Sequence, residues 1–174
     1  VAADSEDIAE EALKLIDVKY EILKPILDPV EAMKPGSAKV YDESKGNIAQ
    51  HLVQEYGDTE KGFKKADYVF EDEFKSSAQP HAPLERQGCT CSWDVEGNLT
   101  MWTPTQMTHL LRWMAAKILE IQEAKVRVLS PYVGGAFGGK VGIIFPHQII
   151  SAVLAKKTGR PVKIEFSRSD DFAN

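Results

Sequence analysis

The sequence has only two cysteines, Cys89 and Cys91, among its 174 residues, which excludes a small domain held together by disulfides. It has no apolar run near the ~18–20 residues of a membrane-spanning helix, so we expect no membrane partner. Neither charge predominates, because 21 basic and 26 acidic residues leave a formal net charge of −5. Nucleic-acid-binding domains usually carry a basic face, so we expect no nucleic-acid partner.

A globular protein is indicated by what the sequence does contain. Hydrophobic residues make up 43% of the chain, a proportion typical of folded domains and too high for a disordered one. The chain begins at Val1 and ends at Asn174, just after a helix is predicted to begin, so we expect a piece of a longer protein. No basic segment followed by a short apolar segment opens the chain, so we expect a cytoplasmic rather than a secreted protein.

Helical and strand patterns alternate along the chain and predict a mixed α/β fold of the α+β class. Apolar residues at helical spacing predict helices over 4–16, 28–33, 59–66, 107–119 and 146–158. Alternating or β-branched segments predict strands over 18–22, 68–74, 89–95, 99–102, 126–129 and 162–166, with a hairpin turn at 96–98. Residues 35–58 lack periodicity and are rich in Gly, Ser and charged residues, so we interpret them as a linker.

The strongest motif is a strand, a glycine-rich loop and a helix that together run from Val126 to Lys157. Phe137 is flanked on each side by a pair of glycines, Gly134, Gly135, Gly138 and Gly139. Because glycine has no Cβ atom, such a loop can bring backbone N–H groups close to a bulky anion. We therefore interpret it as a binding loop rather than a plain turn.

A nucleotide-binding P-loop is the less favoured interpretation of this loop. Gly134-x-x-x-x-Gly139-Lys140 matches the first seven positions of that motif, but the eighth, which needs a Mg²⁺-binding hydroxyl, is Val141. The next helix is predicted to begin only at Pro146, whereas a P-loop places the helix N-terminus directly on the phosphates.

Several ordered motifs carry a family resemblance across nearly the whole chain. They are Gly57–Phe63 followed by Ala66-Asp67, His81-x-x-Leu84-Glu85, Thr105-Gln106, Val133–Lys140, Thr158–Val162 and Ser167-Arg168. In these motifs the chain resembles the large subunit of the molybdenum hydroxylases, the xanthine dehydrogenase/aldehyde oxidase family. Residues 9–21 also resemble the end of that family's α/β-hammerhead domain. The resemblance implies a hammerhead tail over 1–34, a linker over 35–58 and the first part of the molybdenum cofactor-binding domain over 59–174.

The resemblance also implies a cofactor, a reaction and partners. The cofactor would be molybdenum–molybdopterin or its cytosine dinucleotide form. The full enzyme would be an oxidoreductase that inserts water-derived oxygen into a C–H bond of an aldehyde or N-heterocycle. Its partners would be the rest of the large subunit, a small-molecule substrate, and FAD and [2Fe–2S] clusters in other domains or subunits.

For the site, the resemblance places Phe137 and Gly138 against the oxo and sulfido ligands of the metal, with Gly135 and Ala136 in the same cofactor-binding loop. It places Gln106 near the metal, where its amide can donate to an oxo group and accept from bound water. It assigns no catalytic residue and no metal ligand to this chain, because the family's catalytic glutamate lies in a later domain. We therefore expect the isolated chain to be inactive.

One departure from the family leaves its branch open. In the purine and aldehyde branch a substrate-contacting Glu commonly follows Gly-Gly-Lys, but here the residue is Val141. That residue fits carbon monoxide dehydrogenase-like or hydroxybenzoyl-CoA reductase-like subunits at least as well. The alternative function is a non-catalytic binding or assembly domain that uses the glycine loop as a backbone contact only.

The remaining residues with metal-ligating side chains favour structural roles. His81 and Glu85 could ligate a metal only from a helix, which the nearby prolines oppose, so we predict a buried, hydrogen-bonded pair. Two thiols are too few for an iron–sulfur cluster, so Cys89 and Cys91 are expected to be reduced and half-buried. Surface or half-buried positions are expected for the other histidines, His51, His109 and His147.

Overall fold

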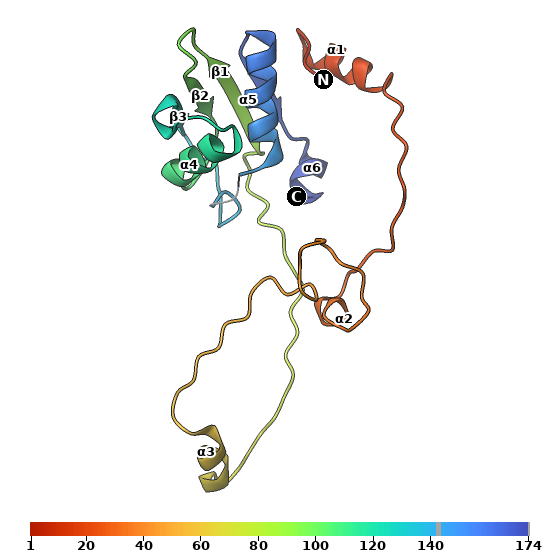
Figure 1. Ribbon diagram of the computed structural model, residues 1–174, viewed down its shortest axis with the longest axis vertical. Coiled ribbons are helices and arrows are strands. Elements are labelled where there is room, and N and C mark those ends of the chain that lie inside the picture. The colour runs from red at the N-terminus through yellow and green to blue at the C-terminus, as the bar shows by residue number, and fades with distance from the viewer. Residues whose placement is uncertain (142–143, 174) are drawn as a thin grey trace. The chain divides into compact units, whose positions relative to one another are not determined.

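The computed structural model describes residues 1–141 and 144–173 of the chain (Figure 1). Two compact units make up the chain: one joins Val1–Glu11 to Ser76–Asn174, and the other spans Ala12–Lys75. None of the helices in the described residues is long and apolar enough to cross a membrane.

A four-stranded sheet in the order β3-β2-β1-β4 forms the centre of the first unit. Its strands are β1 (Gly88–Trp93), β2 (Leu99–Trp102), β3 (Val126–Leu129) and β4 (Val162–Glu165). β1 pairs antiparallel with β2 and β4, whereas β2 and β3 are parallel. The predicted hairpin is confirmed, because the N–H of Asp94 donates to the carbonyl of Asn98 (3.0 Å) and the Asp94 carboxylate accepts from the N–H of Asn98 (2.7 Å).

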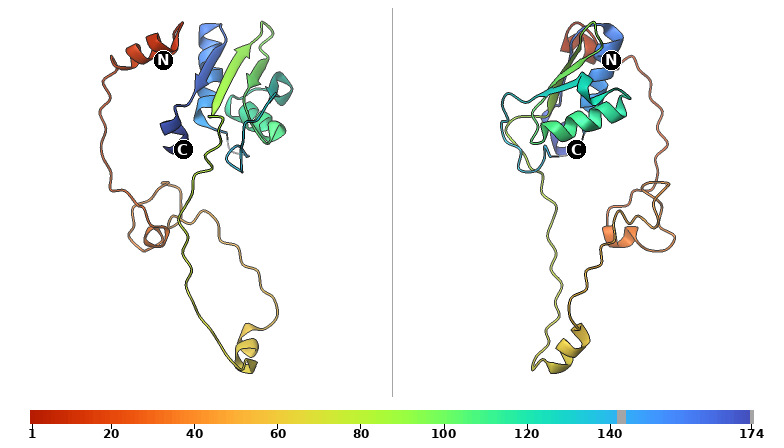
Figure 2. Two further views of the ribbon diagram at one scale, coloured as in Figure 1. Left: turned by 180° about the vertical axis from the view of Figure 1, so that it is seen from behind. Right: turned by 60° about the vertical axis from the view of Figure 1, so that its left-hand side comes forward.

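One face of the sheet is covered by the helices α4 (Thr108–Ile118) and α5 (Pro146–Thr158) (Figures 1 and 2). The strand register places Cys91, Leu99 and Met101 on that face, where they share one apolar cluster with Ala115 of α4 and Ala152 of α5. The other face carries mostly polar side chains, among them Thr90, Ser92, Thr100, Arg127 and Lys163. This alternation is typical of a sheet with one solvated face, and it confirms the predicted mixed α/β class.

Helix α5 has the ends that the sequence predicts. Pro146 is its first residue, and Gly159 follows its last turn with a left-handed φ of +64°, donating its N–H to the carbonyl of Ala155 (3.0 Å). His147, however, is only 2% exposed, so the prediction of a surface or half-buried position is wrong. The spacing of His147, Ser151 and Ala155 puts all three on the helix face that meets the sheet. The rings of Phe145 and Phe166 enclose the His147 imidazole.

The two cysteines are free thiols in the core, more deeply buried than the half-buried positions predicted. Their sulfur atoms are 3.5 Å apart, and the Ser151 hydroxyl donates to Cys91 Sγ at 3.1 Å. The hydrogen bond with Cys89 and the burial both raise the pKa of the Cys91 thiol, so Cys91 remains protonated at neutral pH. The pair therefore acts as small apolar side chains under α5.

Four short helices and a 3₁₀ turn complete the elements of the described residues: α1 (Glu6–Leu13), α2 (Pro29–Ala32), α3 (Thr59–Lys65), η1 (Glu123–Lys125) and α6 (Arg168–Ala173). The carboxylates of Asp28 and Asp58 cap α2 and α3 by accepting from backbone N–H groups at 2.8 and 3.0 Å. These helices confirm the predictions over 4–16, 28–33 and 59–66.

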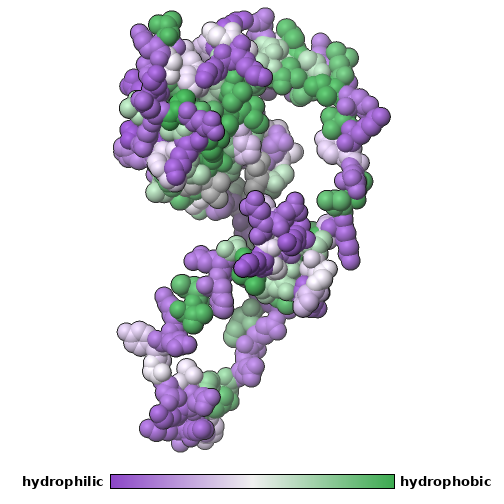
Figure 3. Space-filling model, in the orientation of Figure 1, coloured by the Kyte–Doolittle hydropathy of each residue, from purple (hydrophilic) through white to green (hydrophobic). Residues whose placement is uncertain are grey.

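The predicted strands over 18–22 and 68–74 are wrong, since both segments are extended but unpaired. A strand needs a neighbour for its N–H and C=O groups, and no segment in the described part of the chain pairs with either one. Their large side chains are exposed: Tyr20 by 82%, Ile22 by 93% and Phe70 by 90%. Around α2 and α3, Figure 3 shows apolar patches lying between polar ones at the surface. Alternation alone therefore did not suffice to build a strand here.

Candidate functional site

The glycine loop, residues 134–140, leaves β3 with an unusual backbone. Gly135 and Gly138 have φ angles of +99° and +92°, a region that favours glycine. Phe137 also has a positive φ of +52°, which is uncommon for a bulky residue, and its side chain is 74% exposed. Strain of this kind persists only where the surrounding structure holds it, and it is concentrated at functional sites.

Both ends of the loop are attached to a single carboxylate. Glu85 Oε2 accepts from the N–H of Gly134 at 2.7 Å and from Lys140 Nζ at 2.6 Å. In return the N–H of Glu85 donates to the carbonyl of Gly134 at 3.1 Å. The Lys140 side chain is 1% exposed and the Glu85 side chain 34%, so the ammonium is withdrawn from solvent while the carboxylate keeps part of its exposure.

The packing against the loop explains two of its glycines. A Cβ atom at Gly134 would lie 2.6 Å from Glu85 Cβ, and one at Gly139 would lie 3.0 Å from His81 Cγ. His81 is exposed and lies beside the loop, while the Glu85 carboxylate turns to Lys140. The predicted buried pair of His81 and Glu85 is therefore wrong. The Glu85 carboxylate accepts hydrogen bonds from the Gly134 N–H and the Lys140 ammonium instead of from His81.

The middle of the loop has backbone donors without acceptors. The N–H groups of Gly139 and Val141 donate to the carbonyls of Ala136 and Gly138 at 2.7 and 3.3 Å. Within the described residues, no hydrogen bond uses the N–H groups of the four consecutive residues Gly135, Ala136, Phe137 and Gly138. Consecutive amides in a loop with left-handed residues form concavities that suit anions. These four residues and Gln106 are the ones that the family resemblance predicts for cofactor binding.

Gln106 is joined to the end of this loop. Its N–H donates to the carbonyl of Lys140 at 3.0 Å, and its side-chain Oε1 accepts from the N–H of Lys140 at 3.3 Å. The hydroxyl of Thr105 donates to the same carbonyl at 3.3 Å. Since the Gln106 oxygen is engaged by the loop, its exposed amide nitrogen is left as a donor just before α4. The structure thus joins Gln106 to the end of the loop that carries the other four predicted site residues.

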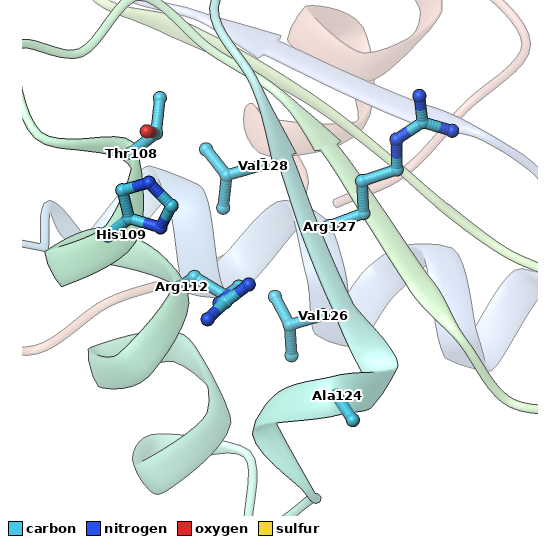
Figure 4. Close-up of a pocket in the computed structure, with 7 residues that line it drawn as sticks. All are labelled: Thr108, His109, Arg112, Ala124, Val126, Arg127 and Val128. Carbon is cyan, nitrogen blue, oxygen red and sulfur yellow. The ribbon is translucent and has the colours of Figure 1, made fainter.

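Two depressions in the described residues lie elsewhere. One of about 350 Å³ lies between α4 and β3 (Figure 4), and one of about 500 Å³ lies beside Trp93 and Lys156. In Figure 4 Val126 and Val128 point toward α4, whereas Arg127 points away from it. Neither depression is lined by the glycine loop or Gln106. No cluster of three or more His, Cys, Asp or Glu side chains in residues 1–141 and 144–173 could hold a metal ion.

Two residues of the site carry roles that sequence reasoning missed. Lys140 was noted as part of a P-loop pattern and of the family's glycine-loop motif, but neither assigned it a partner, and its ion pair with Glu85 spans 55 positions of sequence. Arg168 donates to the carbonyls of Pro83 and Leu84 at 2.8 and 2.7 Å, which fixes the segment that carries Glu85. The motifs Gly-Gly-Lys and Ser-Arg were the available signals, but their partners lie far away in sequence.

Comparison with known proteins finds relatives that match nearly the whole chain. The chain is 38% identical over 170 residues to a probable subunit of xanthine dehydrogenase from Bacillus subtilis, covering 98% of this chain and 22% of the relative. It is 34% identical to the nicotinate dehydrogenase large molybdopterin subunit of Eubacterium barkeri, covering 98% of this chain and 39% of the relative. The crystal structure of quinoline 2-oxidoreductase from Pseudomonas putida 86 matches 98% of this chain and 22% of its own, with a TM-score of 0.87 and 30% identity.

The chain thus spans well under half the length of these relatives. The match to a family reaches from residue 40 through the glycine loop to residue 174. The chain belongs to the molybdopterin cofactor-binding domain family.

Proposed function

We propose that this chain supplies part of the molybdopterin site in the large subunit of an oxidoreductase. The observation that carries the proposal is the run of four unused backbone N–H groups, residues 135–138, between two anchored loop ends. Fixed amide dipoles stabilise anionic groups in a site that excludes water, because the donors need no reorganisation. The anionic ligands of a bound molybdenum centre are groups of this kind.

The site offers the cofactor two kinds of hydrogen-bond donor. Gly135, Ala136, Phe137 and Gly138 offer backbone donors, and Gln106 adds one side-chain amide donor from the neighbouring segment. When bound, the cofactor would supply the redox chemistry that inserts water-derived oxygen into a C–H bond of an aldehyde or N-heterocycle. This chain's residues bind and orient the group, and we assign none of them to proton transfer.

The wider setting of the chain belongs to the same proposal. We assign 1–34 to the tail of a hammerhead domain, 35–58 to a linker and 59–174 to the first part of the cofactor domain. FAD and iron–sulfur clusters would lie in other domains or subunits of a cytoplasmic enzyme, and the cofactor would be molybdopterin or its cytosine dinucleotide. One relative is named a large molybdopterin subunit, which supports the assignment to a large subunit.

Hydrogen exchange of the full-length large subunit tests the proposal. The protein is prepared with and without cofactor, its molybdenum and pterin are measured, and exchange is followed residue by residue over 134–141. Loading should slow exchange at residues 135–138, whose amides donate to no acceptor within the described residues. The hairpin turn at 94–98 serves as an internal control and should not change. A loaded protein with unchanged exchange at 135–138 would place the cofactor elsewhere, and a protein without molybdenum would favour the non-catalytic binding domain.

A further inference from the structure

We propose that Glu85 and Lys140 are positioning residues, a clasp that holds the glycine loop in its binding shape before any cofactor is present. The consequence for binding rests on the proposed function, whereas the clasp itself is a property of the chain alone. Neither residue needs to touch the cofactor to act in this way, since they act through the loop between them.

The clasp closes the loop into a ring. One oxygen of Glu85 bonds both the first residue of the loop, through the Gly134 N–H (2.7 Å), and the last, through Lys140 Nζ (2.6 Å). The Glu85 carbonyl receives a second, longer contact from Lys140 Nζ at 3.4 Å. The four unused amides lie between these anchored ends.

Lys140 also carries the contact to Gln106. Its N–H and carbonyl both bond Gln106, while its ammonium bonds Glu85, so three segments far apart in sequence meet at one residue. A loop with four glycines loses much conformational entropy when it is ordered. A clasp that orders the loop in advance removes that cost from the binding step.

Burial sets this ion pair apart from exposed pairs such as Lys163–Glu165. The Lys140 side chain is 1% exposed and the Glu85 side chain 34%, whereas the pair Lys163–Glu165 on β4 has Lys163 66% exposed. Exposed pairs contribute little, but removing one partner of a buried pair leaves a charge without compensation. For Glu85→Gln that charge is the Lys140 ammonium, whereas Lys140→Met leaves only the more exposed carboxylate.

The test uses the cofactor-free full-length large subunit and the exchange of the four bonded amides, Gly134, Gly139, Lys140 and Val141. Lys140→Met should speed their exchange about tenfold or more, because the loop opens without its anchor. Lys163→Met is the matched control and should leave it unchanged. The double variant Lys140→Met/Glu85→Gln leaves neither charge without a partner, so it should unfold at the same temperature as the parent. Its loop amides should nevertheless exchange as fast as those of Lys140→Met. A purely structural pair would instead give parental exchange in the double variant.

A second measurement is the half-time for pterin release from the loaded protein, which should shorten in Lys140→Met and not in Lys163→Met. Exchange at the parental rate in Lys140→Met would overturn the clasp. If variants of residues 135–138 still lose cofactor in that event, the proposed function stands without the clasp. If the parent never contains pterin, the proposed function fails, and exchange in the cofactor-free chain still decides for or against the clasp. Should Lys140→Met fail to fold, the double variant provides the same exchange comparison.

Discussion

At the scale of single residues, the positive φ of Gly138 in the glycine loop restricts which side chains that position can accept. Gly138 has a φ of +92°, where a valine would be strained by ~1–3 kcal/mol, and the strain would move the amides of residues 135–138. We expect Gly138→Val in the full-length protein to lose most of its molybdenum and turnover. Gly97→Val in the hairpin turn (φ +78°) is the control, since its strain is similar but remote from the site. Equal molybdenum in both variants would contradict the role given to the loop.

Gln106→Ala tests the second donor of the site. The change removes the side-chain oxygen that accepts from the Lys140 N–H and the free amide nitrogen beside it. We expect turnover to fall by an amount equivalent to ~1–3 kcal/mol, the cost of losing one such partner. Gln122→Ala, on an exposed residue before η1, is the control for the chemical change. Turnover and molybdenum content equal to those of the parent would make Gln106 a residue of structure only.

His147 gives the first unit a pH-dependent stability. Burial lowers the pKa of this imidazole from 6.5 to about 4, and the nearby Asp171 offsets that effect only in part. The unfolded chain therefore takes up a proton that the folded chain does not, so stability is full above pH 6.5 and declines until about pH 4. The loss should reach about 3 kcal/mol in urea unfolding, taking 1.36 kcal/mol per pKa unit. His147→Leu should abolish this decline, whereas His109→Leu on the exposed side of α4 should retain it.

At the scale of elements, features set by neighbouring residues were predicted correctly, whereas features that depend on contacts between distant segments were not. The hairpin and α5 were predictable because their turn, proline and glycine signals act within a few residues of each other. The segments 18–22 and 68–74 alternate equally well, but pairing depends on a neighbour that alternation cannot reveal. The same holds at the candidate site: motifs were enough to propose the loop and Gln106, whereas the partners of Glu85 and the burial of His147 depend on long-range packing.

The contact between α5 and β1 is made by small side chains and should tolerate no added volume. Ala152 is fully buried, and its carbonyl accepts from Trp93 Nε1 at 2.8 Å. Ala152→Leu should therefore destabilise the first unit by ~1–3 kcal/mol, since the helix would have to move off the sheet. Val153→Leu, one residue along and 37% exposed, should change the urea midpoint little. An unchanged midpoint for Ala152→Leu would mean that the contact is looser than these distances indicate.

At the scale of the whole molecule, the chain spans only part of the length of its relatives, which bears on the proposed site. In the described structure Phe137, Gly138 and Gln106 are exposed, Gly135 is half-buried and Ala136 is buried. Neither of the depressions beside α4 and Trp93 is lined by these residues. The relatives are about two and a half to four and a half times as long as the matched segment, as coverages of 39% and 22% indicate. The proposed site therefore depends on segments that this chain does not supply.

The isolated chain should for this reason be catalytically inactive. We expect no reduction of a dye acceptor above the buffer blank with aldehydes or purines, with or without molybdate, whereas the full-length protein provides the positive control.

The chain should also fail to bind Mg-ATP, because Val141 has no hydroxyl for Mg²⁺ and α5 begins only at Pro146. Calorimetric titration should show no micromolar binding, which would correspond to ~−8 kcal/mol. Turnover by the isolated chain would show that it carries catalytic groups that we have not assigned, and micromolar Mg-ATP binding would show that Lys140 serves a nucleotide rather than Glu85.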